Sequence, residues 1–287
     1  MHGITGITGQ VGGAVADALL AAGETVRAVA RNAGRAATWT ARGCPLALAD
    51  MTDVQALTHA FANVKGVFVL IPPIFDPSPD FAEVRAVIAA VRGALQATRP
   101  ARVVVLSTVG AQARERNLLN QLGLAERELG ALDLSVAFLR AAWFMENAAW
   151  DVESARRGVI ESFLQPLDRA IPMVATVDIG AQAARLLQQD WIGRRVVELQ
   201  GPALVSPNTL AATFARLLHH PVQAQATPRE RWEALFRSQD MANPLPRMQM
   251  LDGFNQGWIA FESGETVEQA SGTTTLETVL RGLLARG

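Results

Sequence analysis

The chain has 287 residues and a formal net charge of −1, with 49% hydrophobic and 18% charged residues. This length and balance are typical of a globular protein that buries a full core. The near-neutral charge gives no general attraction to nucleic acid or to an anionic membrane, so neither is an expected partner. A single cysteine, Cys44, excludes an internal disulfide and favours a reducing, cytoplasmic location.

No apolar run approaches the roughly 20 residues that a membrane span needs. We expect no secretory leader, because the first glycine-rich turn begins a few residues after Met1. The four histidines and the acidic residues show no spacing typical of metal ligands, so no metal site is predicted.

The first half of the chain alternates short apolar runs with helical stretches, beginning with a short strand before Gly6. Further strands are expected at 26–30, 46–49, 67–71, 102–106 and 134–139, and helices at 11–22, 80–97 and 117–130. This alternation predicts an α/β fold of the Rossmann type, a doubly wound parallel sheet wrapped by helices.

After about residue 142 the pattern is less regular. Strands are expected at 171–177 and 196–199, and helix starts at Asp178, Ser206, Thr227 and Thr274-Thr275, where polar side chains precede helical stretches. We expect residues 1–142 to form the dinucleotide-binding domain. Residues 143–287 are expected to form a smaller, mostly helical lobe on the substrate side, with some segments returning to the sheet. No flexible linker separates the two, so they should share an interface.

The run from Thr5 to Gly12 is a glycine-rich turn between a strand and a helix. Such a turn lets the backbone approach a dinucleotide pyrophosphate and presents the free N–H groups of the helix to it. A purely structural turn is the alternative interpretation. The cofactor contacts expected here are Gly6, Thr8, Gly9, Gln10, Val11 and Gly12.

Arg31 stands at the end of the second expected strand, where an NAD-selective protein usually has an acidic residue. A guanidinium there suits the 2′-phosphate of NADP, and Arg35 follows one helical turn later. Asp50 and Met51 are placed to contact the adenine. We therefore expect NADP(H) to be preferred over NAD(H), which remains an alternative cofactor. The competing interpretations are a solvated Arg31 and a loop in which Thr52 or Asp53 caps the next helix; the cap and the adenine contact could both hold.

Ligands of a doubly wound sheet bind at the carboxyl ends of its strands, which here are followed by the loops 71–75, 107–109 and 141–147. We expect the nicotinamide to be bordered by Ile71, Pro72, Pro73 and Thr108. The wall facing a small aromatic electron acceptor is expected to contain Phe75, Trp143, Phe144 and Asn147. Core packing is the alternative role for these aromatic side chains.

With these motifs the chain resembles the NmrA-like group of atypical short-chain dehydrogenases/reductases. The resemblance covers nearly the whole length, and its marks are Thr5–Gly12, Val26–Arg31, Asp50-Met51, Val67–Pro73, Val104–Thr108, Gly110-Ala111, Glu126 and Leu139–Asn147. It implies an NADP(H)-preferring Rossmann domain with a small second lobe. Members are either NAD(P)H-dependent reductases of quinones, azo compounds and related acceptors, or non-catalytic redox sensors that bind a protein partner such as a transcription factor.

The chain contains no tyrosine, and the helix holding Glu126 lacks the Tyr-x-x-x-Lys pair found in many related reductases. A quinone needs no protein acid, because the hydroquinone anion formed by hydride transfer can be protonated by solvent. Ser107 and Thr108 are weak candidates for hydrogen-bonding a developing oxyanion, and local backbone bonding is their alternative role. We expect Glu126 to order its helix. The leading hypothesis is an NADPH-dependent quinone or azo reductase, and the alternative is an NADP(H) sensor.

Overall fold

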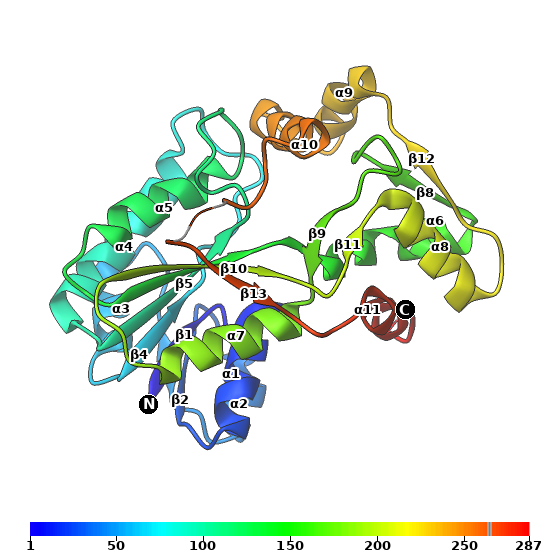
Figure 1. Cartoon of the computed structure of the whole chain (residues 1–287). Helices are drawn as coiled ribbons and strands as arrows, with labels where there is room; N and C mark the ends of the chain where they lie inside the picture. The colour runs from blue at the N-terminus through cyan, green and yellow to red at the C-terminus, as the bar shows by residue number, and fades with distance from the viewer. Residues whose placement is uncertain (263, 265, 287) are drawn as a thin grey trace.

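The computed structural model describes residues 1–262, 264 and 266–286. Its largest element is a parallel sheet of eight strands in the order β13-β10-β6-β5-β4-β1-β2-β3 (Figure 1). These strands are β1 (His2–Thr5), β2 (Val26–Ala30), β3 (Leu46–Leu48), β4 (Gly66–Val69), β5 (Arg102–Thr108), β6 (Val136–Ala141), β10 (Arg194–Gln200) and β13 (Glu268–Ser271). The central strands β1, β4 and β6 are buried at every residue, as in parallel sheets covered on both faces.

Two layers of helices cover the sheet and form its two hydrophobic cores. On one face lie α3 (Val54–Phe61), α4 (Ala82–Thr98) and α5 (Asn120–Gly130). On the other face lie α1 (Gln10–Ala21), the short η1 (Gly34–Ala36) and α2 (Ala37–Ala41), and α7 (Thr176–Gln188). The predicted Rossmann-type fold is therefore confirmed, with α7 supplied by the second half of the chain.

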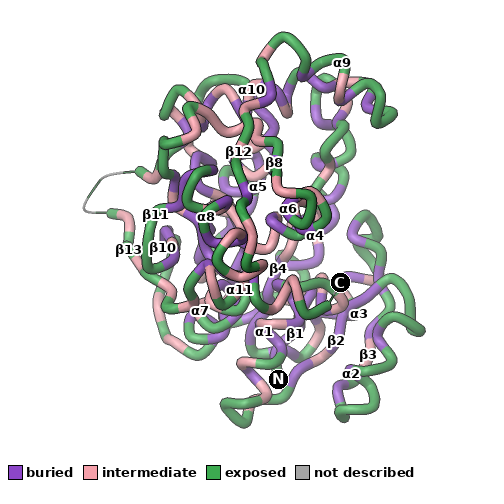
Figure 2. The backbone as a smooth tube through the Cα atoms, turned by 90° about the vertical axis from the view of Figure 1, so that its right-hand side faces the viewer, coloured by how far each residue is buried: buried purple, intermediate pink, exposed green. Residues whose placement is uncertain are grey.

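The second lobe packs around a third core, which contains the fully buried Trp232. Its strands form two small sheets, β11-β9-β7 and β12-β8. The strands are β7 (Trp143–Phe144), β8 (Val159–Ser162), β9 (Ile171–Val174), β11 (Leu204–Val205) and β12 (Gln223–Ala226). The helices are η2 (Met145–Asp151), α6 (Val152–Arg156), α8 (Pro207–Leu218), η3 (Arg229–Arg231), α9 (Trp232–Arg237), α10 (Leu245–Gln256) and α11 (Leu276–Leu284). Figure 2 shows the buried backbone of both lobes enclosed by exposed turns.

Two of the four predicted helix starts are confirmed, because the hydroxyl groups of Ser206 and Thr275 accept hydrogen bonds from the backbone of α8 and α11. The other two were wrong. Asp178 lies inside the first turn of α7 and accepts hydrogen bonds from the backbone N–H and the hydroxyl of Thr274, both at 2.9 Å. The hydroxyl of Thr227 has no partner in the described part of the chain, and η3 begins without a side-chain cap.

The strand order reverses at β1, which pairs with β4 on one side and β2 on the other. Thr5 fastens the carboxyl ends of β1 and β4 together: its hydroxyl donates to the carbonyl of Phe68 at 3.1 Å and accepts from the N–H of Leu70 at 2.8 Å. A reversal of this kind opens a crevice where ligands of such sheets bind. None of the described helices combines the length and apolar character required to cross a membrane.

Candidate active site

The glycine-rich turn connects β1 to α1 at this crevice. Gly6 has a φ of +64°, and a Cβ on Gly12 would lie 2.3 Å from the carbonyl oxygen of Gly6. A side chain at Gly6 would be strained by the positive φ, and one at Gly12 would require the backbone to move. Gly9 precedes α1 and provides no side-chain cap, so the first N–H groups of this helix are available to a ligand. This cradle fits a pyrophosphate group.

The residues expected around the adenosine end lie after β2 and β3. Arg31 and Arg35 are exposed, and Arg31 is close enough to contribute to lowering the pKa of Asp50. The larger cause of that lowered pKa is hydrogen bonding, because Asp50 accepts from the hydroxyl and the N–H of Thr52 at 2.7 and 2.9 Å. Met51 is 8% exposed and belongs to the hydrophobic core, so its contact with an adenine stays a prediction.

Of the two cap positions expected from the sequence, Thr52 and Asp53, the structure uses Asp53, whose carboxylate accepts from the N–H groups of Gln55 and Ala56. This cap and the exposed Asp50 coexist in one short loop. The loop therefore both starts α3 and presents a carboxylate beside Arg31.

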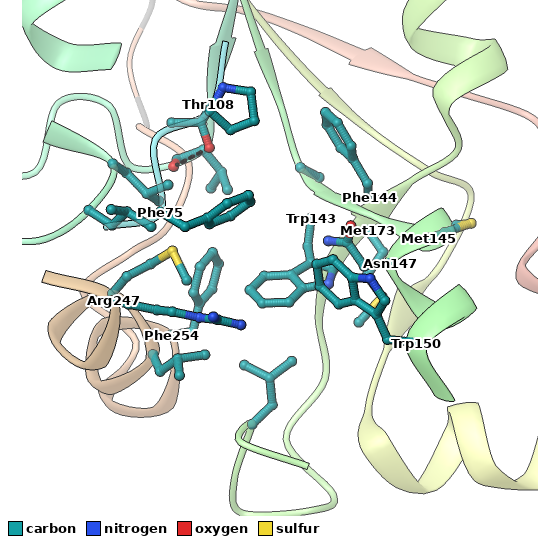
Figure 3. Close-up of a pocket in the computed structure, with 18 of the residues that line it drawn as sticks. Phe75, Thr108, Trp143, Phe144, Met145, Asn147, Trp150, Met173, Arg247 and Phe254 are labelled. Carbon is teal, nitrogen blue, oxygen red and sulfur yellow. Dashed lines mark hydrogen bonds between the residues drawn. The ribbon is translucent and has the colours of Figure 1, made fainter. Parts of the chain in front are cut away.

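A cavity of about 620 Å³ extends from the glycine turn to the second lobe. Its cofactor end is lined by Gln10 and Val11 of the glycine-rich turn and by the four residues expected beside the nicotinamide: Ile71, Pro72, Pro73 and Thr108. The expected acceptor-facing residues Phe75, Trp143, Phe144 and Asn147 line the same cavity. Figure 3 shows them converging from separate elements of the two lobes. Whether each contacts a ligand stays a prediction, but their convergence in one space is a feature of the structure.

Further residues enlarge the aromatic wall beyond those selected from the sequence. Trp150 is 69% exposed at the rim, and Phe254 meets Trp143 edge-on with 5.2 Å between ring centroids. Arg247 and Asp151 also line the cavity. None of these four residues was selected from the sequence. Arg247 and Phe254 come from α10, and nothing in the sequence connects that helix to the earlier loops.

Ser107 and Thr108, the two candidate catalytic hydroxyl groups, have different environments. The hydroxyl of Ser107 is buried and donates to Glu126 at 2.6 Å. Thr108 is half-buried, and its hydroxyl donates to the carbonyl of Val109 at 3.2 Å, a local backbone bond. Of the two, Thr108 has the weaker bond within the protein. A catalytic role for it remains a prediction.

Glu126 belongs to a buried ionic network beside the site. Arg140 on β6 donates to both carboxylate oxygens of Glu126, at 2.9 and 2.8 Å, and also contacts Glu198 at 3.3 Å and Glu262 at 2.7 Å. Burial by itself lowers the pKa of Arg140, but hydrogen bonds to Glu126 and Glu262 and their charges raise it above its usual value. The expectation that Glu126 orders its surroundings agrees with these contacts.

Comparison with known proteins places this geometry in a family. Residues 6–172 match the family model described as NAD(P)H-binding, which is more than half of the chain. The chain belongs to this NAD(P)H-binding family. The predicted nicotinamide dinucleotide cofactor is thereby confirmed at the level of NAD(P)H.

Two curated relatives share 25% identity with the chain. One is the NAD(P)H azoreductase of Xenophilus azovorans, over 84% of this chain and 82% of the relative. The other is quinone oxidoreductase 2 of Escherichia coli, over 96% of both chains. The solved structure of the NADPH-dependent quinone oxidoreductase QOR2 of Escherichia coli with NADPH matches with a TM-score of 0.81, at 24% identity and 99% coverage of both chains. The family resemblance drawn from the sequence is confirmed.

Proposed function

We propose that the protein is an NADPH-dependent reductase of quinones, with azo compounds as further acceptors. One observation carries the proposal: a single cavity joins the glycine turn to an aromatic wall open at its rim. Its volume of about 620 Å³ falls within the ~300–1,000 Å³ of small-molecule sites. The named activities of the two curated relatives support the same acceptor classes.

The residues fit the cofactor in order along the crevice. The N-terminus of α1 would hold the pyrophosphate, Arg31 and Arg35 the 2′-phosphate, and the loops at Pro72 and Thr108 would border the nicotinamide. When bound, NADPH supplies a hydride to the acceptor and leaves as NADP⁺. The aromatic wall stacks the acceptor and excludes water around the reacting carbon or nitrogen.

The acceptor must also gain a proton. The chain has no tyrosine to provide it. A quinone tolerates this because the two electrons and one hydrogen of the hydride produce a stabilised hydroquinone anion, which solvent at the open rim protonates. A simple ketone would form a much more basic alkoxide and is not a proposed substrate. A sensor function has less support, because a sensor has no need of an open aromatic cavity over the nicotinamide.

The first test measures NADPH and NADH oxidation with menadione, beside a reaction without protein. We expect turnover with both cofactors and a lower KM for NADPH. Arg31→Ala should raise the KM for NADPH about ten- to hundredfold, since a charge-assisted hydrogen bond contributes roughly 1.5–3 kcal/mol. The effect on NADH should be much smaller.

Arg157→Ala is the matched control, because it removes an exposed arginine from the second lobe. It should leave both KM values within about twofold, as surface substitutions usually do. Absence of menadione turnover above background would contradict the reductase proposal. An equal loss of NADPH and NADH affinity in Arg31→Ala would contradict recognition of the 2′-phosphate by this residue.

A further inference from the structure

Arg247 brings a positive charge into the aromatic cavity. It lies near the start of α10, and Figure 3 shows its side chain reaching into the cavity towards Trp143. Its guanidinium carbon lies 4.5 Å from the ring centroid of Phe236 and 5.8 Å from that of Phe75. Contacts of this kind orient the flat guanidinium and leave the N–H groups at its edge free to donate.

The positive charge of Arg247 is not stabilised by the residues around it. Burial lowers the pKa of this guanidinium, and none of the carboxylates in the described part of the chain offsets the effect. A positive charge near a helix N-terminus is also unfavourable. By contrast, Arg229 in the same lobe forms a two-bond pair with Asp252, at 2.7 and 2.8 Å.

Two carboxylates line the same cavity, Asp151 on η2 and Glu161 on β8. Neither forms an ion pair with Arg247, and no described residue accepts a hydrogen bond from its guanidinium. Up to five donors of an arginine are therefore available to whatever enters the cavity. An unpaired, half-buried guanidinium is a ready partner for an anion.

We propose that Arg247 is the anion-recognising residue of the acceptor site, and that the cavity selects flat aromatic acceptors bearing a carboxylate or sulfonate. This inference rests on the reductase function proposed above and names its substrate class. The guanidinium would bind the anionic group by two parallel hydrogen bonds while the ring stacks against Trp143 and Phe254. The anionic group takes no part in hydride transfer and leaves unchanged on the product.

The test compares two acceptors that share one quinone ring: menadione bearing a propanoate side chain, and the methyl ester of the same compound. With NADPH saturating, we expect the wild-type kcat/KM to favour the propanoate. Arg247→Gln should lower the propanoate-to-ester ratio of kcat/KM about ten- to hundredfold, the effect of one lost charge-assisted interaction. Arg247→Lys, which keeps the charge but not the planar donor pair, should restore part of the ratio.

Arg231→Gln is the matched control, because it removes an exposed arginine from η3, outside the cavity. It should leave the ratio at its wild-type value. If Arg247→Gln lowers turnover of both acceptors equally, or changes neither, the assignment of Arg247 to anion recognition is wrong. A ratio that falls equally in Arg231→Gln would also overturn it, since the effect would then be one of overall charge.

A binding measurement separates this proposal from the reductase function. Quenching of tryptophan fluorescence reports ligands beside Trp143 and Trp150, and it needs no turnover. We expect naphthoate to bind the wild-type protein at least tenfold more tightly than naphthamide, and this preference to vanish in Arg247→Gln. Equal affinities in the wild-type protein would overturn the inference even if menadione is reduced. The expected preference without any turnover would instead contradict the reductase proposal alone.

Discussion

Asp151 places a carboxyl group in the wall of a largely aromatic cavity, and burial raises its pKa from 3.8 to about 6. Well below pH 3.8 the group is neutral in both folded and unfolded chains, so burial has no electrostatic penalty. As the pH rises from 3.8 towards 6, the unfolded chain releases the proton while the folded protein keeps it, so stability is lost and the loss is complete once the folded group ionises. The residue therefore works against folding at neutral pH.

Asp151→Asn should consequently stabilise the protein above pH 6 and have little effect near pH 4. The expected gain is on the order of 1–3 kcal/mol, from 1.36 kcal/mol per pKa unit reduced for partial solvent access. Urea unfolding at pH 4.5, 6 and 8 would measure it. Glu153→Gln, an exposed neighbour on α6, is the control and should show no such dependence on pH. A gain that is the same at all three pH values would count against the buried carboxylate.

For individual residues, the sequence predicted a role correctly where that role depends on the geometry of one short segment. Gly6 and Gly12 were identifiable because their spacing between strand and helix reports the shape of the turn. Arg247 and Asp151 were not, because a cavity lining depends on contacts between distant segments. The contact of Phe75 with Arg247 on α10 joins segments that are far apart in the sequence.

The buried ionic network around Arg140 joins residues from several secondary-structure elements. Glu126 projects from α5, Ser107 from β5 and Arg140 from β6, while Glu198 on β10 completes the arrangement. Glu198 in turn accepts from the backbone N–H of Glu262 and from the side chain of Gln269 on β13. Four neighbouring strands are thus tied to one helix by charges that are almost fully buried, with exposed side-chain fractions of 3% for Arg140, 5% for Glu126 and 0% for Glu198.

Removing one member of this network should be costly. Glu126→Gln removes the carboxylate that accepts two bonds from Arg140, while Glu198 and Glu262 still offset the arginine charge, and we expect a loss of about 1.5–3 kcal/mol in the free energy of unfolding. Glu128→Gln is the control on the same helix, since Glu128 and Arg92 are exposed and 3.5 Å apart. It should change stability by less than about 1 kcal/mol. Similar losses for both variants in urea unfolding would show that the network stabilises no more than a surface pair.

The sequence predicted the strands correctly where they are buried, because buried strands consist mostly of apolar residues. β2 was predicted with its observed bounds, and β5 and β6 within two residues at either end, because these strands are apolar. β13 was missed, since the run Glu-Gln-Ala-Ser has no apolar alternation. Its place at the sheet edge depends on pairing with β10, a long-range contact that local pattern cannot express.

The sheet as a whole is assembled from both halves of the chain. β10 pairs with β6, β13 pairs with β10, and α7 packs against α1 within the core on one sheet face. The expected boundary at residue 142 therefore marks the start of the second lobe. It does not separate two hydrophobic cores, because β10, β13 and α7 follow it and pack with the first half of the chain. We propose that neither half is an independent folding unit.

A fragment of residues 1–142 tests this proposal. It would expose the edge of β6, leave Arg140 without Glu198, and uncover the face of the sheet beneath α7. We expect it to show no cooperative thermal unfolding by circular dichroism and no binding of NADPH, although it contains the complete glycine turn. The full chain, treated in the same way, should unfold in one transition that moves to higher temperature with NADPH, because a ligand bound only to the folded state stabilises it. A fragment that melted cooperatively and bound NADPH would show that the first 142 residues form a domain of their own.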